Sequence, residues 1–431
     1  NKRETYQGDF QLNTEAKSDE TNAFSKEQKS ILLLCFLCYS AAYMGRLNIS
    51  AALPGVTSAL AISDVQSGLF QTVFAIVYAV GQIVNGSLSD RIKSKINIGL
   101  GLIISSVCNI AFAMSMSYSL SVMIWALNGV GQSMIWTPAV KLISEYFSGE
   151  KRDRASFIMS ITVILGHFAA WGISGLTAAY LGIKTSFIIP AFIMTAAAVY
   201  SIIVLCFKKK NKTQTLISDS KTEVSAQPVK PMTVGKTLSS TGLIALLICC
   251  ICNGFVRDSI VTWTPTVLSS GSGSVTLQST LLSLILPIFE LVGIAAAKKS
   301  YAVSGSSARK ANGIVLASSA VFSLILIFVY KNTFAAALML ALACAANYGV
   351  NPMLTTFIPM EYDKAGRVGF VAGTVDCFIY IGSALAGVLT GAVSESAGWQ
   401  NVYVLWTVVA LAGAGLSFVS ASRGKKGLSE L

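Results

Sequence analysis

The chain has 431 residues, of which 53% are hydrophobic and 12% are charged, and this balance excludes a soluble globular domain. Its net charge of +12 does not indicate nucleic-acid binding, because most of the basic excess falls in the connections on one predicted membrane face. The nine cysteines stand mostly in apolar surroundings, typical of small buried hydrophobic residues. With a single histidine in the chain, we expect no metal site and no cofactor.

Apolar stretches long enough to cross a bilayer follow one another along the chain, each needing about 20 residues. They predict an all-α, multi-pass integral membrane protein with about twelve transmembrane helices. The membrane would be the plasma (inner) membrane of a bacterium, and an organelle membrane remains open. The predicted spans are 31–53, 66–88, 96–116, 120–146, 155–180, 184–207, 241–268, 275–297, 311–330, 334–359, 367–392 and 400–422.

The orientation follows from the basic residues, which collect in short cytoplasmic loops. Every even-numbered connection is basic, as in RIKSK at 91–95, KRDR at 151–154 and KKKNK at 208–212, whereas the odd-numbered connections hold almost no lysine or arginine. We therefore expect both termini to be cytoplasmic.

The polar stretch 208–240 is too hydrophilic to cross a membrane and divides the chain into two halves. The halves resemble each other, because Arg46 and Arg257 are 211 residues apart (257 − 46) and Glu145 and Glu361 are 216 apart (361 − 145). These offsets indicate a parallel internal repeat of two pseudo-symmetric six-helix bundles, the organisation of major facilitator transporters. The predicted parts are a disordered cytoplasmic tail (1–25), an N-terminal bundle (26–207), a cytoplasmic linker (208–240), a C-terminal bundle (241–422) and a second cytoplasmic tail (423–431).

Two arginines stand inside predicted spans, and each is followed eight residues later by a proline, Pro54 after Arg46 and Pro265 after Arg257. A charge within a membrane span is costly and marks a functional site. A guanidinium keeps its charge and matches phosphate oxygens, so two of them on equivalent helices predict a dianion site between the halves. The alternative is that each arginine pairs with a structural acid or with carbonyl groups, and Asp258 is such a neighbour of Arg257.

Four further polar residues stand inside predicted spans. His167 is either a hydrogen-bonded core residue or a ligand of the substrate, and Lys141 is expected to extend toward the membrane surface. Asp376 either bonds across helices or takes part in coupling, and Glu290 is considered for coupling or closure.

Several segments resemble a known family. The loop GSLSDRIKSK at 86–95, with Asp90 and Arg91, is similar to the conserved loop of the major facilitator superfamily. Within that superfamily, YSAAYMGRLN around Arg46 and FVRDSIVTWTPTVL around Arg257 resemble the first and seventh helices of the organophosphate:phosphate antiporters, which include glycerol-3-phosphate and hexose-phosphate transporters. GHFAAWGIS resembles their fifth helix and FELVGI their eighth.

The resemblance implies exchange of a phosphorylated small organic anion for inorganic phosphate, by rocker-switch alternating access. It implies a substrate site formed by Arg46, Arg257, Tyr39, Tyr43 and His167, to which we add Gln82 from its position. It also implies a role at the site or in closure for Glu290, and a role in locking helix ends for Asp90 and Arg91. Asp376, which matches no residue of the family, is a further candidate for coupling or gating, as are Asp258 and Lys141. One departure concerns Gln82, which stands where the antiporters tend to carry a lysine. With Asp258 and Asp376 added, the site is less positive. Either the substrate has less negative charge or carries its own cation, as a zwitterionic phosphoester or phosphonate does, or transport is coupled to protons instead of exchange for inorganic phosphate.

Three functional classes are open: a transporter of organic phosphates, a proton-coupled symporter of a carboxylate-type anion, and a membrane sensor of hexose phosphate. We do not expect an enzyme, because no nucleophile–base pair, phosphate loop or nucleotide motif is present. The expected partners are an organic phosphate, inorganic phosphate or protons, and the lipid bilayer. We expect a monomer that binds no nucleic acid.

Overall fold

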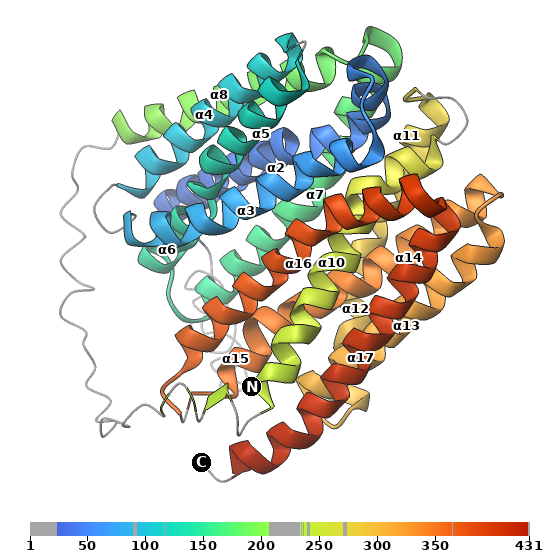
Figure 1. Cartoon of the computed structure of the whole chain (residues 1–431). Coiled ribbons are helices and arrows are strands. Elements are labelled where there is room, and N and C mark those ends of the chain that lie inside the picture. The colour runs from blue at the N-terminus through green and yellow to red at the C-terminus, as the bar shows by residue number, and fades with distance from the viewer. Residues whose placement is uncertain are drawn as a thin grey trace, which may run out of the picture.

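The computed structural model describes residues 24–88, 93–115, 117–206, 233, 235, 237–238, 242–269, 274–363 and 365–429. Every regular element in these ranges is a helix (Figure 1). The predicted tail 1–25 falls almost wholly outside them, as do most of the linker 208–240 and the loop residues Asp90 and Arg91. The elements are α2 (Lys26–Leu60), α3 (Asp64–Leu88), α4 (Ser94–Met114), α5 (Tyr118–Ser133), α6 (Trp136–Tyr146), α7 (Gly149–Leu181), α8 (Thr185–Cys206), α10 (Leu243–Leu268), α11 (Leu277–Ser283), α12 (Ile285–Val303), α13 (Ala308–Val329), α14 (Thr333–Pro352), the π-helix η1 (Met353–Phe357), α15 (Ile358–Met360), α16 (Val368–Ala397) and α17 (Trp399–Ser429).

Eleven helical segments of the described chain are long and apolar enough to cross a membrane. The remaining predicted span, 120–146, is divided into α5 and α6, so the prediction of one continuous helix there is wrong. Pro138 lies in the first turn of α6 and has no N–H to donate to a preceding carbonyl, which accounts for the break. Counted together, α5 and α6 complete the twelve predicted crossings.

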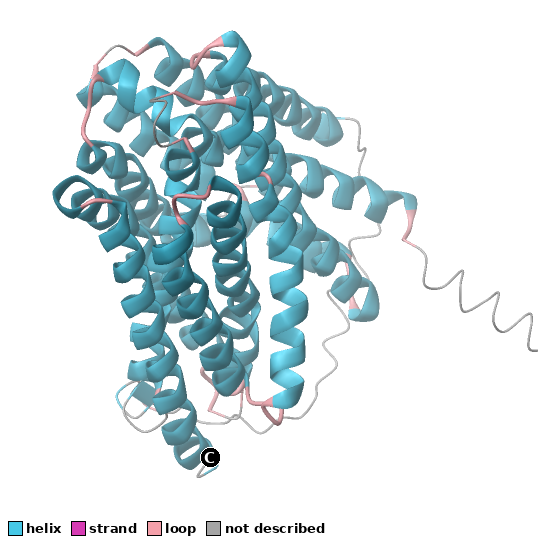
Figure 2. Ribbon diagram, turned by 90° about the vertical axis from the view of Figure 1, so that its right-hand side faces the viewer, coloured by secondary structure: helices cyan, strands magenta, loops and turns pink. Residues whose placement is uncertain are grey.

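The helices form two groups, α2 to α8 and α10 to α17, which separate clearly in Figure 1. Each group packs mainly within itself and presents large apolar side chains outward, as Val107 and Phe328 do. Outward apolar faces suit a lipid environment. Figure 2 shows the same helices edge-on, lying side by side with short connections. The prediction of two six-helix bundles is therefore confirmed, whereas the cytoplasmic placement of the termini remains a prediction.

The two halves are joined along one side of the molecule. Asp64 accepts a hydrogen bond of 2.7 Å from Ser394, and Thr72 donates one of 2.6 Å to the carbonyl of Ala384. Gly68 and Gly387 meet so closely that a Cβ on either would overlap the carbonyl of the other. Further hydrogen bonds between described residues of the two halves lie between this edge and the level of His167, so the α2–α3 and α16–α17 turns mark the joined side.

Two residues of the predicted site, Arg46 and His167, share one depth with Tyr78. Arg46, Tyr78 and His167 are each fourteen residues from the helix end on the joined side (60 − 46, 78 − 64, 181 − 167). At 1.5 Å per residue this is about 21 Å along each helix, close to the middle of a bilayer.

Candidate functional site

Polar side chains of the N-terminal half hold the backbone of α2 beside Arg46. The carbonyl of Gly45 accepts hydrogen bonds from the Asn109 amide of α4 at 3.2 Å and the Asn128 amide of α5 at 3.0 Å. Asn48 donates to Asn109 at 2.7 Å. Hydrogen bonds between helices are a main means of fixing helix position inside a membrane. The position of Arg46 is therefore set by three helices.

The guanidinium of Arg46 lies among aromatic rings. Its central carbon is 4.8 Å from the centre of the Tyr78 ring, 5.2 Å from that of Phe74 and 5.7 Å from that of Tyr43. No described residue forms a hydrogen bond or a direct ion pair with it, and it is partly exposed. Aromatic faces stabilise a cation without occupying its N–H groups. Arg46 is thus charged, held in place and able to donate to an anion.

Arg257, on α10, is engaged differently. Its Nε donates to Asp258 Oδ1 at 2.7 Å and its Nη2 to Asp258 Oδ2 at 3.1 Å, and its Nη1 donates to Asn351 at 3.3 Å. The ion pair between Arg257 and Asp258 that the sequence analysis considered is therefore present. A guanidinium has five N–H groups, so these three bonds leave two for a ligand. Asp258 therefore compensates the charge of Arg257 while some N–H groups of Arg257 remain available for a ligand.

Close helix packing positions the partners of Arg257. Gly254 of α10 lies against the backbone of α16 at Ile379, and Gly382 of α16 lies against α10, so a side chain at either glycine would be blocked. This approach lets Ser383 donate a hydrogen bond to Asp258. Asn351 stands directly before Pro352 and the π-helix η1, and π-helical turns often occur at functional sites.

The two arginines are connected electrostatically. Asp258 interacts with Arg46 as well as with Arg257, and Asp376 of α16 interacts with both guanidinium groups. Asp376 is partly buried and forms no hydrogen bond or salt bridge with any described residue. Tyr380, one turn beyond Asp376, lies with its ring 5.1 Å from that of Tyr78. The charges of both halves therefore converge at one level.

His167 and Glu290 form a second connection between the halves. The Nδ1 of His167 is 2.7 Å from Glu290 Oε1, and both side chains are fully buried. The Nε2 of His167 and the Oε2 of Glu290 have no hydrogen-bond partner. The structure thus places the histidine in contact with Glu290 rather than open to a ligand.

The remaining predicted residues lie at varying distances from the arginines. Tyr39, about two turns of α2 before Arg46, packs with its ring 4.7 Å from the Trp136 ring and 5.3 Å from the Tyr43 ring. Gln82 is one turn of α3 beyond Tyr78 and partly exposed. Lys141 is partly buried in α6, five residues before the end of that helix (146 − 141). Asp90 and Arg91 lie outside the described residues.

The sequence predictions did not include five residues that contact this site: Phe74, Tyr78, Tyr348, Asn351 and Tyr380. For Tyr380, the sequence does contain a pattern that could have predicted its place at the site. Asp376, Tyr380 and Ser383 stand at i, i+4 and i+7, which is one face of a helix.

Outside the membrane-spanning segments, Arg309 at the start of α13 is buried and donates to Glu361 at 2.9 Å and to the Tyr362 hydroxyl at 2.9 Å. Burial raises the pKa of Glu361 above its ordinary value, although the charge of Arg309 acts in the opposite direction. In the N-terminal half, Lys95 at the start of α4 lies 5.7 Å from the Tyr146 ring. A tyrosine follows each of the two repeated glutamates, Tyr146 after Glu145 and Tyr362 after Glu361, so the sequence repeat corresponds to a repeated contact between a basic side chain and a tyrosine.

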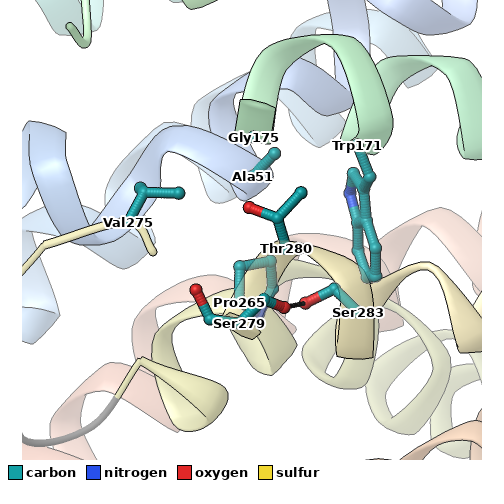
Figure 3. A pocket seen from close by; sticks show the side chains of 8 residues that line it. All are labelled: Ala51, Trp171, Gly175, Pro265, Val275, Ser279, Thr280 and Ser283. Atoms are coloured by element: carbon teal, nitrogen blue, oxygen red, sulfur yellow. Dashed lines mark hydrogen bonds between the residues drawn. The ribbon is translucent and has the colours of Figure 1, made fainter. Parts of the chain in front are cut away.

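A small cavity lies away from the charges. Its volume is about 10 Å³, the space of one water molecule, and Figure 3 shows it between Trp171, Pro265 and Thr280. It contains no charged side chain, and the hydrogen bond from Ser283 to the carbonyl of Ser279 borders it at 2.8 Å. This cavity is not suited to an organic anion. It is lined by Ala51, Trp171, Gly175, Pro265, Val275, Ser279, Thr280 and Ser283.

Two six-helix bundles with charged residues at mid-depth define a multi-pass integral membrane protein with a polar site between its halves. The sequence model of the Major Facilitator Superfamily matches residues 35–379. The chain therefore belongs to the Major Facilitator Superfamily. A solved structure with the same fold is that of a bacterial homolog of the human lysosomal transporter Spinster, inward-facing and unoccupied. Its TM-score is 0.74 at 16% identity, covering 94% of this chain and 99% of that chain.

The relatives, all at modest identity, differ in the function that their names give. The chain is 27% identical over 158 residues to a probable hexose phosphate transport protein of Chlamydia trachomatis, covering 37% of this chain and 35% of that protein. It is 22% identical over 273 residues to the hexuronate transporter of Bacillus subtilis, covering 63% and 64%. It is 31% identical over 125 residues to the membrane sensor protein UhpC of Escherichia coli, covering 29% and 28%. In none of the three does the match cover two thirds of the relative's length.

Proposed function

We propose that this chain is a secondary transporter of a phosphorylated small organic anion, such as a sugar phosphate, a glycerol phosphate or a related phosphoester or phosphonate. The observation that carries this proposal is the pair of arginines from equivalent helices of the two halves, at the level where the halves meet. Similarity to a hexose phosphate transport protein supports the same substrate class.

The anion would bind to both guanidinium groups at once. Arg46 has its N–H groups available, and Arg257 retains two N–H groups after its bonds to Asp258 and Asn351. Planar guanidinium groups bind phosphate oxygens in pairs, which neither a lysine nor a hydroxyl reproduces. A phosphate held from both sides draws the halves together, and its release allows them to part. This is a rocker-switch cycle about a fixed site.

We propose exchange for inorganic phosphate as the mode of transport, because two arginines that bind the phosphate group of the substrate can also bind free phosphate. The test is uptake of a labelled organic phosphate into proteoliposomes loaded with phosphate, compared with vesicles loaded with sulfate and with a pH gradient. We expect loading with phosphate to stimulate uptake. An uptake rate that does not depend on internal phosphate but increases with the pH gradient would contradict exchange.

A second candidate function is proton-coupled symport of a carboxylate-type anion. The hexuronate transporter of Bacillus subtilis favours it, because that match covers more of this chain than the other two. Two acids inside predicted spans, the fully buried Glu290 and the partly buried Asp376, provide groups that could carry a proton. Competition by a hexuronate but not by any phosphorylated compound would support this second function.

A further inference from the structure

The charges at the site do not favour a simple dianion. Two arginines and three acids interact at this level, and His167 is a further side chain there that can take a positive charge. With His167 neutral, the five charges sum to −1, and with His167 protonated the sum is zero. The charged residues that contribute are Arg46, Arg257, Asp258, Glu290 and Asp376.

The three acids differ in their hydrogen bonds. Asp258 is bonded to Arg257 and to Ser383, and Glu290 is bonded to His167. Of these three, Asp376 is the one that forms no hydrogen bond with a described residue, and it is partly exposed. An ionisable side chain inside a membrane span without a partner is costly and marks a ligand or ion site.

The surroundings of Asp376 suit an organic cation. Tyr380 lies one turn further along the same helix, and its ring packs against that of Tyr78. Faces of tyrosine rings bind ammonium and quaternary ammonium groups, and a carboxylate beside them adds an opposite charge. The same ring of Tyr78 contacts Arg46, so the cation site adjoins the anion site.

We propose that the substrate is a zwitterion, an organic phosphate or phosphonate that carries its own amine or quaternary ammonium group. The inference rests on the proposed function and specifies the substrate of that same site. The phosphate binds Arg46 and Arg257, and the cationic end binds Asp376 and the rings of Tyr380 and Tyr78. A ligand of this kind brings a positive group to Asp376 and adds one negative charge fewer to the site than a plain dianion does, whereas a plain dianion adds only like charge to that of Asp376.

The test compares two ligands of the same shape. Phosphocholine and 3,3-dimethylbutyl phosphate differ only in a quaternary nitrogen replaced by carbon. We expect phosphocholine to stabilise the purified full-length protein against heat, with an affinity roughly tenfold or more above that of the neutral isostere. Phosphoethanolamine and 2-hydroxyethyl phosphate form a second matched pair for a smaller cation.

The variant Asp376→Asn should reduce the preference in each pair to near one while binding of the neutral isostere is kept or improved. Asp376→Glu should retain the preference, which separates a charge effect from a folding defect. Equal or tighter binding of both neutral members by the wild type would overturn the inference, as would an unchanged preference in Asp376→Asn. If no phosphorylated compound binds and a carboxylate does, the proposed function fails, and the zwitterion inference fails with it.

Discussion

At the scale of the residue, the two arginines carry the same charge in different environments. Arg46 is surrounded by aromatic rings and has its donors available, whereas Arg257 shares its charge with Asp258. A cation with free donors contributes more to binding an anion than one already compensated. We therefore assign Arg46 the larger part of the phosphate affinity.

Arg46→Lys tests this assignment. An ammonium keeps the charge but loses the planar pair of donors, so we expect the affinity for a phosphorylated ligand to fall roughly tenfold or more. Ligand-dependent thermal stabilisation of the purified protein measures it. Arg152→Lys, an exposed position in the first turn of α7, is the matched control and should bind as the wild type does. Unchanged affinity in Arg46→Lys would remove Arg46 from the site.

Glu290→Gln tests the buried contact between the halves. The change removes the negative charge from a fully buried pair with His167, and breaking such a pair costs about 3 kcal/mol. We expect a lower melting temperature in detergent and slower transport, because the halves lose an attachment near the middle of the membrane. Glu150→Gln, exposed at the start of α7, should change neither. A wild-type melting temperature in Glu290→Gln would show that the pair is not ionised.

At the scale of the element, α3 and α16 form the main contact of the joined side. Gly68 and Gly387 allow their backbones to touch, and the bonds of Thr72 and Ser394 follow along the same helices. Small residues permit close approach of membrane helices, and such contacts tolerate no added volume. Opening on this side requires these two helices to separate.

Gly387→Ala would place a methyl group against the carbonyl of Gly68. We expect the joined side to open more often and transport to slow. The measurement is labelling of a cysteine introduced at Ser394 by a membrane-impermeant maleimide, which should rise above the background of the native cysteines. Gly373→Ala, on the same helix with open space around it, should leave labelling unchanged. Equal labelling in the two variants would show that α3 and α16 do not control access.

Glu361→Gln tests the cluster at the start of α13. Arg309 would lose its ion pair while its side chain stays 3% exposed. We expect a loss of about 2 kcal/mol, less than for a fully buried pair because the Glu361 side chain is 28% exposed. The readout is the melting temperature in detergent. Asp363→Asn, exposed two residues further on, is the control, and an equal effect of both substitutions would exclude a specific role for the ion pair.

At the scale of the whole molecule, hydropathy predicts the fold well because a helix crossing lipid must satisfy its backbone internally and stay apolar outside. That constraint placed the twelve crossings and the two halves. It did not predict the break between Ser133 and Trp136 in the fourth span, because a broken helix there remains apolar over the whole window. Tolerance of a broken helix depends on neighbouring helices, which a hydropathy window does not contain.

The site was predictable in part. Two charges in lipid and their repeat spacing identified Arg46 and Arg257, since such charges are rare and need a reason. The contact between His167 and Glu290, and the pairing of Arg257 with Asn351, depend on how helices rotate against one another. Tyrosines such as Tyr348 carry no comparable signal, because an aromatic residue inside a span is ordinary in lipid.

The central claim is that both halves bind one phosphorylated anion through Arg46 and Arg257. Counterflow in proteoliposomes, with phosphate, glycerol phosphate, hexose phosphates, phosphocholine and a hexuronate as competitors, tests it most directly. We predict that at least one phosphorylated organic compound competes and that Arg46→Lys and Arg257→Lys each abolish the exchange. Competition by the hexuronate alone, or full exchange in either lysine variant, would contradict the claim.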